Sequence, residues 1–184
     1  VVVIVDQTKL PNQVVWVNIK TRDEMASAIK EMKLRGAPLI GVAAAYGLAL
    51  TSFHSKAETK EELLKELKES AEVLLKTRPT AVNLFWAIDR VMKKALDTAG
   101  SKEALAEAVV AEAQRMADED VETNRKMGKH GATLIDDGDV VLTHCNAGSL
   151  ATVDYGTALG VVRAAIEEGK NVKVIACETR PRLQ

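Results

Sequence analysis

The chain has 184 residues, the length of one domain or two small ones. Its 25 lysines and arginines against 26 aspartates and glutamates give a formal net charge of −1, which argues against binding to nucleic acid or to an anionic membrane, since both require an excess of positive charge. Hydrophobic residues make up 47% and charged residues 28% of the chain, as in a globular protein. With no signal peptide and no apolar run of the ~20 residues that a membrane span needs, we expect a soluble, cytoplasmic protein.

The first part of the chain predicts a small β element followed by helices. Residues 1–5 and 13–19 are rich in β-branched side chains and predict two strands. Thr21 and Glu24 have the spacing of a capping box, so a helix is expected to follow. Residues 38–51 are apolar almost all round, which predicts a buried helix. Further helices are predicted over residues 58–76, 78–100 and 101–135.

The remaining part of the chain has a different pattern. Residues 140–143 and 172–176 are short apolar stretches that predict two strands, with a helix over 155–168 between them, capped by Asp154. Strand, helix and strand in this order form a parallel βαβ unit. The sequence therefore predicts an α/β fold in two domains: an N-terminal domain of small β and helical elements over 1–130, and over 131–184 the start of a Rossmann-like parallel-sheet domain.

One cysteine lies where α/β sheets commonly bind their ligands. Cys145 directly follows the predicted strand over 140–143, and ligands of open α/β sheets lie beyond the carboxyl ends of the strands. The start of the next helix would favour a thiolate there. The alternative is that Cys145 is a small buried hydrophobic residue, the more frequent role of a free cysteine. Cys177, at the last position of the second strand, is a weaker candidate.

Arginine precedes a proline at three junctions of the chain: Arg35 by three residues, and Arg78 and Arg180 directly. At the first two we predict that a helix begins. An arginine beside a helix N-terminus combines a bidentate guanidinium with free backbone N–H groups, an arrangement suited to phosphate. The alternative is that each arginine only marks a helix junction and lies in solvent or beside a local carboxylate. The recurrence of the pattern weakens this alternative but does not remove it, so both interpretations stay open.

Other kinds of site are not indicated. Neither of the Gly-rich motifs for dinucleotides and nucleoside triphosphates occurs. The three histidines, His54, His130 and His144, are too scattered in the sequence to suggest a metal cluster. The residues by themselves predict an α/β protein that binds a phosphorylated small molecule and carries one candidate thiol.

Five stretches of the sequence stand in order and with compatible spacing: residues 35–38, 78–84, 143–148, 155–160 and 178–181. Together they resemble the methylthioribose-1-phosphate isomerase family. This family belongs to a superfamily with the regulatory α, β and δ subunits of initiation factor 2B. The resemblance implies an aldose–ketose isomerase of methionine salvage, which converts 5-methylthioribose 1-phosphate to 5-methylthioribulose 1-phosphate without a metal or an organic cofactor.

The resemblance also implies roles for individual residues. Cys145 matches the active-site cysteine of the family. The family's catalytic acid, an aspartate, lies beyond the last residue of this chain, so the chain alone is expected to be inactive. The resemblance further implies a phosphorylated pentose as substrate and a homodimer as the assembly. The positions that match substrate-binding residues are Arg35, Gly36, Ala37, Arg78 and Gln184.

Two other functions share parts of this pattern. Ribose-1,5-bisphosphate isomerases of nucleotide salvage have the same arginine and cysteine positions, but carry a His-Ser pair after the cysteine where this chain has Asn146 and Ala147, and lack the proline at Pro38. A non-catalytic regulatory subunit of the initiation-factor-2B kind would bind a translation factor and would not require the Cys145 loop. Both differences from the ribose-1,5-bisphosphate isomerases favour the methylthio sugar. The presence of the Cys145 loop together with Arg35 and Arg78 counts against the regulatory subunit.

Overall fold

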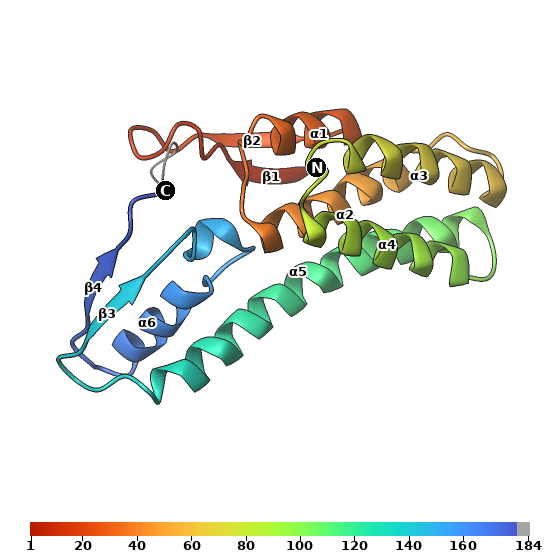
Figure 1. Cartoon of the computed structure of the whole chain (residues 1–184). Coiled ribbons are helices and arrows are strands. Elements are labelled where there is room, and N and C mark those ends of the chain that lie inside the picture. Colours follow the sequence, from red (N-terminus) through yellow and green to blue (C-terminus); the bar gives the residue numbers. More distant parts are fainter. Residues whose placement is uncertain (180–184) are drawn as a thin grey trace. The chain divides into compact units, whose positions relative to one another are not determined.

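The computed structural model describes residues 1–179 (Figure 1). The chain divides into two compact units between Ala117 and Asp118, within the long helix α5 (Lys102–Ala132). The domain boundary predicted at residue 130 lies further along this helix. The division falls earlier because the last turns of α5 pack in the second unit, where the Asp120 carboxylate accepts a hydrogen bond from the Val153 amide (2.8 Å).

The first unit begins with an antiparallel strand pair. β1 (Val2–Val5) and β2 (Trp16–Ile19) pair with Val2 opposite Ile19 and Val5 opposite Trp16. Since side chains alternate along a strand, Ile19 lies on the covered face, whereas Trp16 is 67% exposed on the other. Both strands are confirmed, although β2 begins three residues later than the sequence predicts.

Two helices of the first unit begin with capping boxes. At α1 (Arg22–Lys30) the Thr21 hydroxyl accepts a hydrogen bond from the Glu24 amide (3.2 Å) and the Glu24 carboxylate accepts one from the Thr21 amide (3.2 Å). At α3 (Lys60–Leu75) Thr59 and Glu62 form the same reciprocal pair. The capping box predicted at Thr21 is therefore confirmed, and a second one starts the charged helix.

We expect Thr59→Ala to lower the free energy of unfolding by about 1 kcal/mol, because the amide of Glu62 loses its hydrogen-bond acceptor at the helix start. Urea unfolding followed by circular dichroism measures this difference. Thr59→Ser keeps the hydroxyl and is the matched control, expected to stay within about 0.5 kcal/mol of the wild type. Equal losses in both variants would contradict the capping interpretation.

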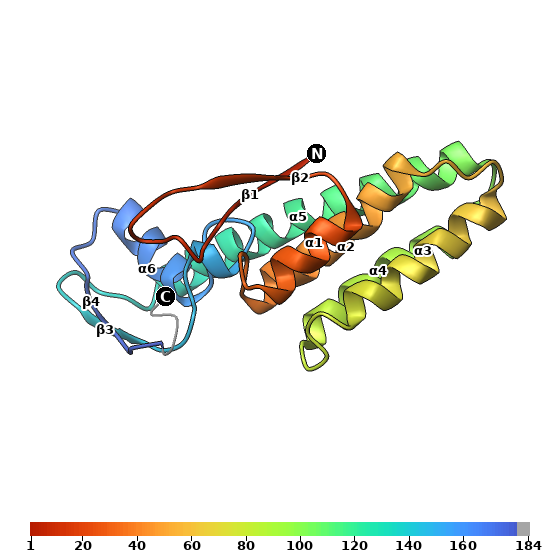
Figure 2. The ribbon, with the colours of Figure 1, turned by 90° about the horizontal axis from the view of Figure 1, so that it is seen from above.

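Helix α2 (Ala37–His54) lies at the centre of the first unit. It contacts α1, α3 and α4 (Val82–Asp97), and both views show α3 and α4 side by side along it (Figures 1 and 2). By length and composition α2 could cross a membrane, but 61% of it is buried, and the core helix of a soluble domain meets the same criteria. The buried helix predicted from the sequence is confirmed. The core around it includes Met25, Ile29, Leu48, Leu67, Leu74 and Leu84.

The second unit contains the predicted parallel βαβ arrangement. β3 (Val140–Thr143) and β4 (Lys173–Ala176) pair in parallel, with Thr143 opposite Ala176. Between them the chain forms a short 3₁₀ turn, η1 (Ser149–Ala151), and helix α6 (Ala158–Glu167). The α/β fold class and the start of a Rossmann-like parallel sheet are confirmed.

Helix α6 begins three residues later than predicted. Tyr155 and Gly156 have φ angles of +78° and +91°, and this left-handed backbone cannot belong to a right-handed helix. The prediction that Asp154 caps the helix is wrong for the same reason. Thr157 occupies the N-cap position, without a side-chain hydrogen bond to the helix.

Candidate active site

The N-terminal ends of α2 and α4 lie against each other in the first unit. A Cβ placed on Gly41, in the second turn of α2, would be only 2.9 Å from the carbonyl oxygen of Asn83, in the first turn of α4. Only glycine permits this close approach of the two backbones. The segments that precede both helices are therefore brought to the same end of the helix pair.

Three of the predicted substrate-binding residues lie at the start of α2. Gly36 is its N-cap residue and Ala37 its first residue, with Pro38 in the first turn. The side chain of Arg35, just before them, is buried. The start of a helix presents free N–H groups and a positive dipole end, so this segment has the backbone donors that an anion requires.

Arg78 lies at the same end of the helix pair, but not where the sequence predicts. α4 begins at Val82 with Ala81 as its N-cap, not at Arg78. The residue before a proline is disfavoured in helical backbone, and the chain makes one turn first, in which the Arg78 carbonyl accepts a hydrogen bond from the Ala81 amide (3.0 Å). The predicted helix start at Arg78 is therefore wrong, and Arg78 lies in the turn that leads into α4.

In the second unit, Cys145 lies two residues beyond β3 and is exposed. Within the described residues Cys145 is therefore not part of a buried core. Its φ angle is +70°, which is uncommon for a residue other than glycine and marks a sharp turn. Cys177 is also exposed, and its amide donates to the carbonyl of Thr143 (3.0 Å), where β3 ends. Both thiols lie at the carboxyl edge of the parallel strands.

The loop that carries Cys145 is tied to the start of α6. The carbonyl of Ala147 accepts hydrogen bonds from the amides of Thr157 (3.0 Å) and Leu159 (3.2 Å). Gly156 lies so close to Gly148 that an added Cβ would be 2.7 Å from the Gly148 carbonyl carbon. Backbone contacts at Ala147 and Gly148 therefore set the path of the loop at its C-terminal end.

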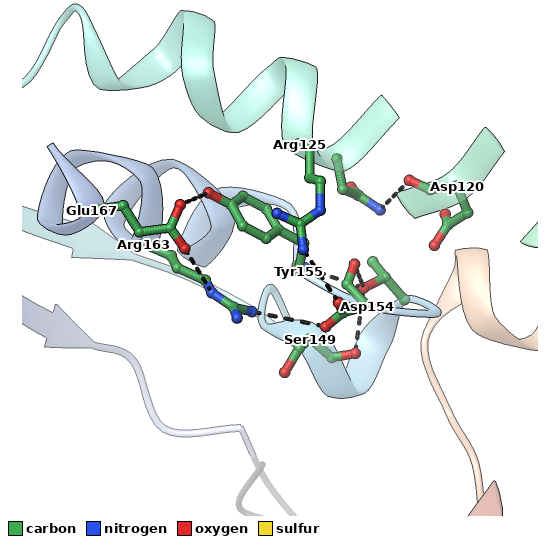
Figure 3. Close-up of polar contacts among 10 residues, drawn as sticks. Asp120, Arg125, Ser149, Asp154, Tyr155, Arg163 and Glu167 are labelled. Carbon is green, nitrogen blue, oxygen red and sulfur yellow. Dashed lines mark hydrogen bonds and ion pairs between the residues drawn. The ribbon is translucent and has the colours of Figure 1, made fainter. Parts of the chain in front are cut away.

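A buried tyrosine with charged neighbours lies directly before this contact, and the sequence interpretation missed it. The Tyr155 hydroxyl donates to the Glu167 carboxylate (2.7 Å), and the guanidinium carbons of Arg125 and Arg163 each lie 4.7 Å from the ring centre (Figure 3). The four-residue spacing of Arg163 and Glu167 on one helix was the available signal. Nothing in the sequence indicates that Arg125, on another helix, joins them.

Two groups in this region have altered acidities. Burial raises the pKa of Tyr155 above its usual 10.0, and the hydrogen bond and charge of Glu167 raise it further. Burial also raises the pKa of Asp120, against the effect of the hydrogen bond from the Val153 amide. Both groups therefore favour their protonated forms more than they would in water.

We expect Tyr155→Phe to lower the free energy of unfolding by about 1–2 kcal/mol at neutral pH, because the hydrogen bond to the Glu167 carboxylate is lost. This difference is expected to shrink above pH 10, since the unfolded tyrosine then loses its proton while the folded one, with its raised pKa, retains it. Urea unfolding of both proteins at neutral and alkaline pH measures the two differences. A difference that grows above pH 10 would contradict the direction of the shift.

The structure describes the predicted site residues in two groups. Arg35, Gly36, Ala37 and Arg78 lie in the first unit and Cys145 in the second, while Gln184 lies outside the described residues. Within residues 1–179, no three histidine, cysteine, aspartate or glutamate side chains are grouped so that they could hold a metal ion.

Comparison with known proteins identifies the family. The sequence pattern of the initiation factor 2 subunit family matches residues 33–184. The chain belongs to this family.

The relatives that match over nearly the whole chain have more particular names. The methylthioribose-1-phosphate isomerase of Thermotoga neapolitana is 55% identical over 98% of this chain and 52% of its own length, and that of Thermotoga maritima is 54% identical over the same shares. The chain thus spans about half the length of these relatives.

Two solved structures share the fold closely. The 5-methylthioribose 1-phosphate isomerase of Pyrococcus horikoshii OT3 matches with a TM-score of 0.88 and 40% identity, over 95% of this chain and 57% of that one. A protein of A. fulgidus described as translation initiation factor eIF-2B, subunit delta, matches with a TM-score of 0.88 and 53% identity, over 98% and 53%.

Proposed function

We propose that the full-length protein is a methylthioribose-1-phosphate isomerase of methionine salvage, an intramolecular oxidoreductase that converts 5-methylthioribose 1-phosphate to 5-methylthioribulose 1-phosphate. The observation that carries this proposal is the exposed Cys145 in an anchored loop at the end of β3. The names of relatives that are 54–55% identical over 98% of the chain support it.

The substrate phosphate is assigned to the first unit. Arg35 and Arg78 would supply guanidinium groups, and Gly36 and Ala37 would supply backbone amides at the start of α2. A phosphate held by arginine and by a helix N-terminus gains charge-assisted hydrogen bonds from both. Gln184 completes the proposed binding set.

The reaction explains why an exposed thiol is useful. The phosphate on the anomeric carbon prevents simple ring opening, so the ring oxygen must be helped to leave while a hydrogen moves between C1 and C2. We assign Cys145 to proton transfer or to stabilisation of the transition state in this step, whether the hydrogen moves as a proton or as a hydride. General acid–base groups contribute ~10²–10⁴-fold to such reactions.

An assay of the full-length protein on methylthioribose 1-phosphate and ribose 1,5-bisphosphate, side by side, tests the proposal. We expect turnover of the first and little or none of the second, since the chain has Asn146 and Ala147 after the cysteine in place of the His-Ser pair. Preference for the bisphosphate would replace the proposed function with that of nucleotide salvage.

A variant of Arg78 tests the phosphate site. Arg78→Gln is expected to raise the dissociation constant for the sugar phosphate about tenfold or more, because a charge-assisted hydrogen bond is lost. Isothermal titration measures the binding. Lys65→Gln, which removes an equal charge from the exposed face of α3, is the control and is expected to bind as the wild type. Equal binding by both variants would contradict the role of Arg78.

The name of the A. fulgidus structure favours a second candidate, a non-catalytic regulatory subunit. Such a subunit would show no isomerase activity and would bind a translation factor. Under the first proposal, the protein is cytoplasmic and forms a homodimer that binds neither nucleic acid nor membrane. Analytical ultracentrifugation of the full-length protein tests the dimer, and absence of turnover together with binding to a translation factor would favour the regulatory subunit.

A further inference from the structure

Tyr155 packs in the small core of the second unit and has charged neighbours in addition. The side chain is 4% exposed and belongs to the core of the second unit with Ala132 and Ala164. In addition, Arg125 and Arg163 both lie over its ring, and its hydroxyl donates to Glu167 (Figure 3). Aromatic rings attract guanidinium groups over their faces, so three polar groups from two helices hold one side chain in place.

The charged groups around the ring also contact one another. The Arg163 guanidinium lies 3.3 Å from the Glu167 carboxylate and 3.8 Å from that of Asp154, and Arg125 also lies 3.8 Å from Asp154. Asp154 directly precedes Tyr155 in the chain. Both arginines therefore contact the ring of Tyr155 and also the carboxylate of Asp154, the residue before it.

The backbone at Tyr155 is in a conformation that the side-chain contacts must maintain. Its φ angle of +78° is unfavourable for a residue with a large side chain. Together with Gly156 it turns the chain back toward Gly148, where the two backbones touch. Loss of the side-chain contacts would allow the turn to relax.

This turn sets the position of the C-terminal end of the loop that carries Cys145. At its N-terminal end the loop leaves β3 at Thr143, whose carbonyl accepts a hydrogen bond from the Cys177 amide (3.0 Å). At its C-terminal end the Ala147 carbonyl accepts hydrogen bonds from the amides of Thr157 and Leu159, just after the turn. Cys145 lies between these two fixed points, two residues from each.

We propose that Tyr155, held by Arg125, Arg163 and Glu167, is a positioning residue that fixes the loop carrying Cys145. The inference rests on the proposed function, in which Cys145 acts on the sugar. A thiol that is misplaced by about 1 Å loses much of its catalytic effect, so the contacts of a buried ring are expected to control turnover without touching substrate.

The test uses full-length protein and two readouts. Tyr155→Leu, which removes the ring and the hydroxyl, is expected to lower kcat on methylthioribose 1-phosphate by at least about tenfold, with KM within about threefold of the wild type. In the same variant, hydrogen exchange of the amides over residues 144–159 is expected to rise by about tenfold, because the bonds to Ala147 open more often.

Conservative and matched variants separate positioning from general damage. Tyr155→Phe keeps the ring under both guanidinium groups but loses the hydrogen bond to Glu167, so its kcat is expected to stay within about threefold of the wild type and its exchange to rise less than in Tyr155→Leu. Trp86→Leu removes an exposed ring that lies 5.6 Å from the Arg90 guanidinium in the first unit, and neither readout is expected to change. Where Tyr155→Leu does not fold, Arg163→Met is measured instead, because that side chain is 47% exposed.

The outcomes distinguish the two proposals. A wild type that isomerises the sugar, with a Tyr155→Leu variant that retains kcat or keeps its exchange unchanged, would overturn the positioning role. A wild type without isomerase activity would overturn the proposed function, while raised exchange in Tyr155→Leu, with a smaller rise in Tyr155→Phe, would still support the anchoring of the loop.

Discussion

Full-length protein with Cys145→Ser is expected to lose ~10²–10⁴-fold in kcat and to bind methylthioribose 1-phosphate nearly as the wild type does. Serine fills about the same space in the exposed loop, but its hydroxyl is a much weaker acid than a thiol. Proton transfer or stabilisation of the transition state is therefore lost. The proposed phosphate-binding residues are unchanged, so substrate affinity is retained. Steady-state kinetics and isothermal titration measure the two quantities.

Cys177→Ser is the matched control for this prediction. Its thiol is also exposed and lies at the end of the neighbouring strand β4, so the two variants differ in position and not in chemistry. We expect Cys177→Ser to keep kcat within about threefold of the wild type. Near-normal turnover in Cys145→Ser, or equal losses in both variants, would refute the role assigned to Cys145.

Gly156→Ala is expected to lower the free energy of unfolding of the second unit by about 2–5 kcal/mol. A left-handed conformation costs alanine about 1–2 kcal/mol, and Gly156 has a φ angle of +91°. The added Cβ would also lie 2.7 Å from the carbonyl carbon of Gly148, and overpacking of this kind costs about 1–3 kcal/mol. Urea unfolding measures the total.

Gly138→Ala separates these two contributions. Gly138 has a φ angle of +88°, close to that of Gly156, but an added Cβ would meet nothing within 4 Å. We expect Gly138→Ala to cost only the conformational part, about 1–2 kcal/mol. Since Gly156 borders the Cys145 loop, Gly156→Ala is also expected to lower kcat, whereas Gly138→Ala is not. Equal effects of the two variants would show that the contact with Gly148 carries no energy.

The elements of this fold that could be predicted are those whose cause is local. Thr21 and Glu24 form their capping box with their own backbone, and α2 is apolar on all sides because it is surrounded by other helices. The short apolar strands around α6 specify a parallel βαβ unit in the same way. Local hydrogen bonding and hydrophobic patterning suffice for these features.

The exact starts of α4 and α6 could not be predicted, although the reasons are visible in hindsight. Pro79 delays α4 until Val82. The left-handed turn at Tyr155 delays α6 until Ala158, and a tyrosine does not by itself signal such a turn. That conformation is maintained by contacts from Arg125, which lies thirty residues earlier on another helix.

The sequence by itself determined the fold class, the order of its elements and the candidate residues Arg35, Arg78 and Cys145, because capping, periodicity and motif spacing act over a few residues. Only the tertiary structure decided that Cys145 is exposed and that the starts of α2 and α4 touch at Gly41. It also decided that charged residues from two helices gather around Tyr155. Burial and contacts between distant segments depend on how the whole chain packs, which no short pattern of residues encodes.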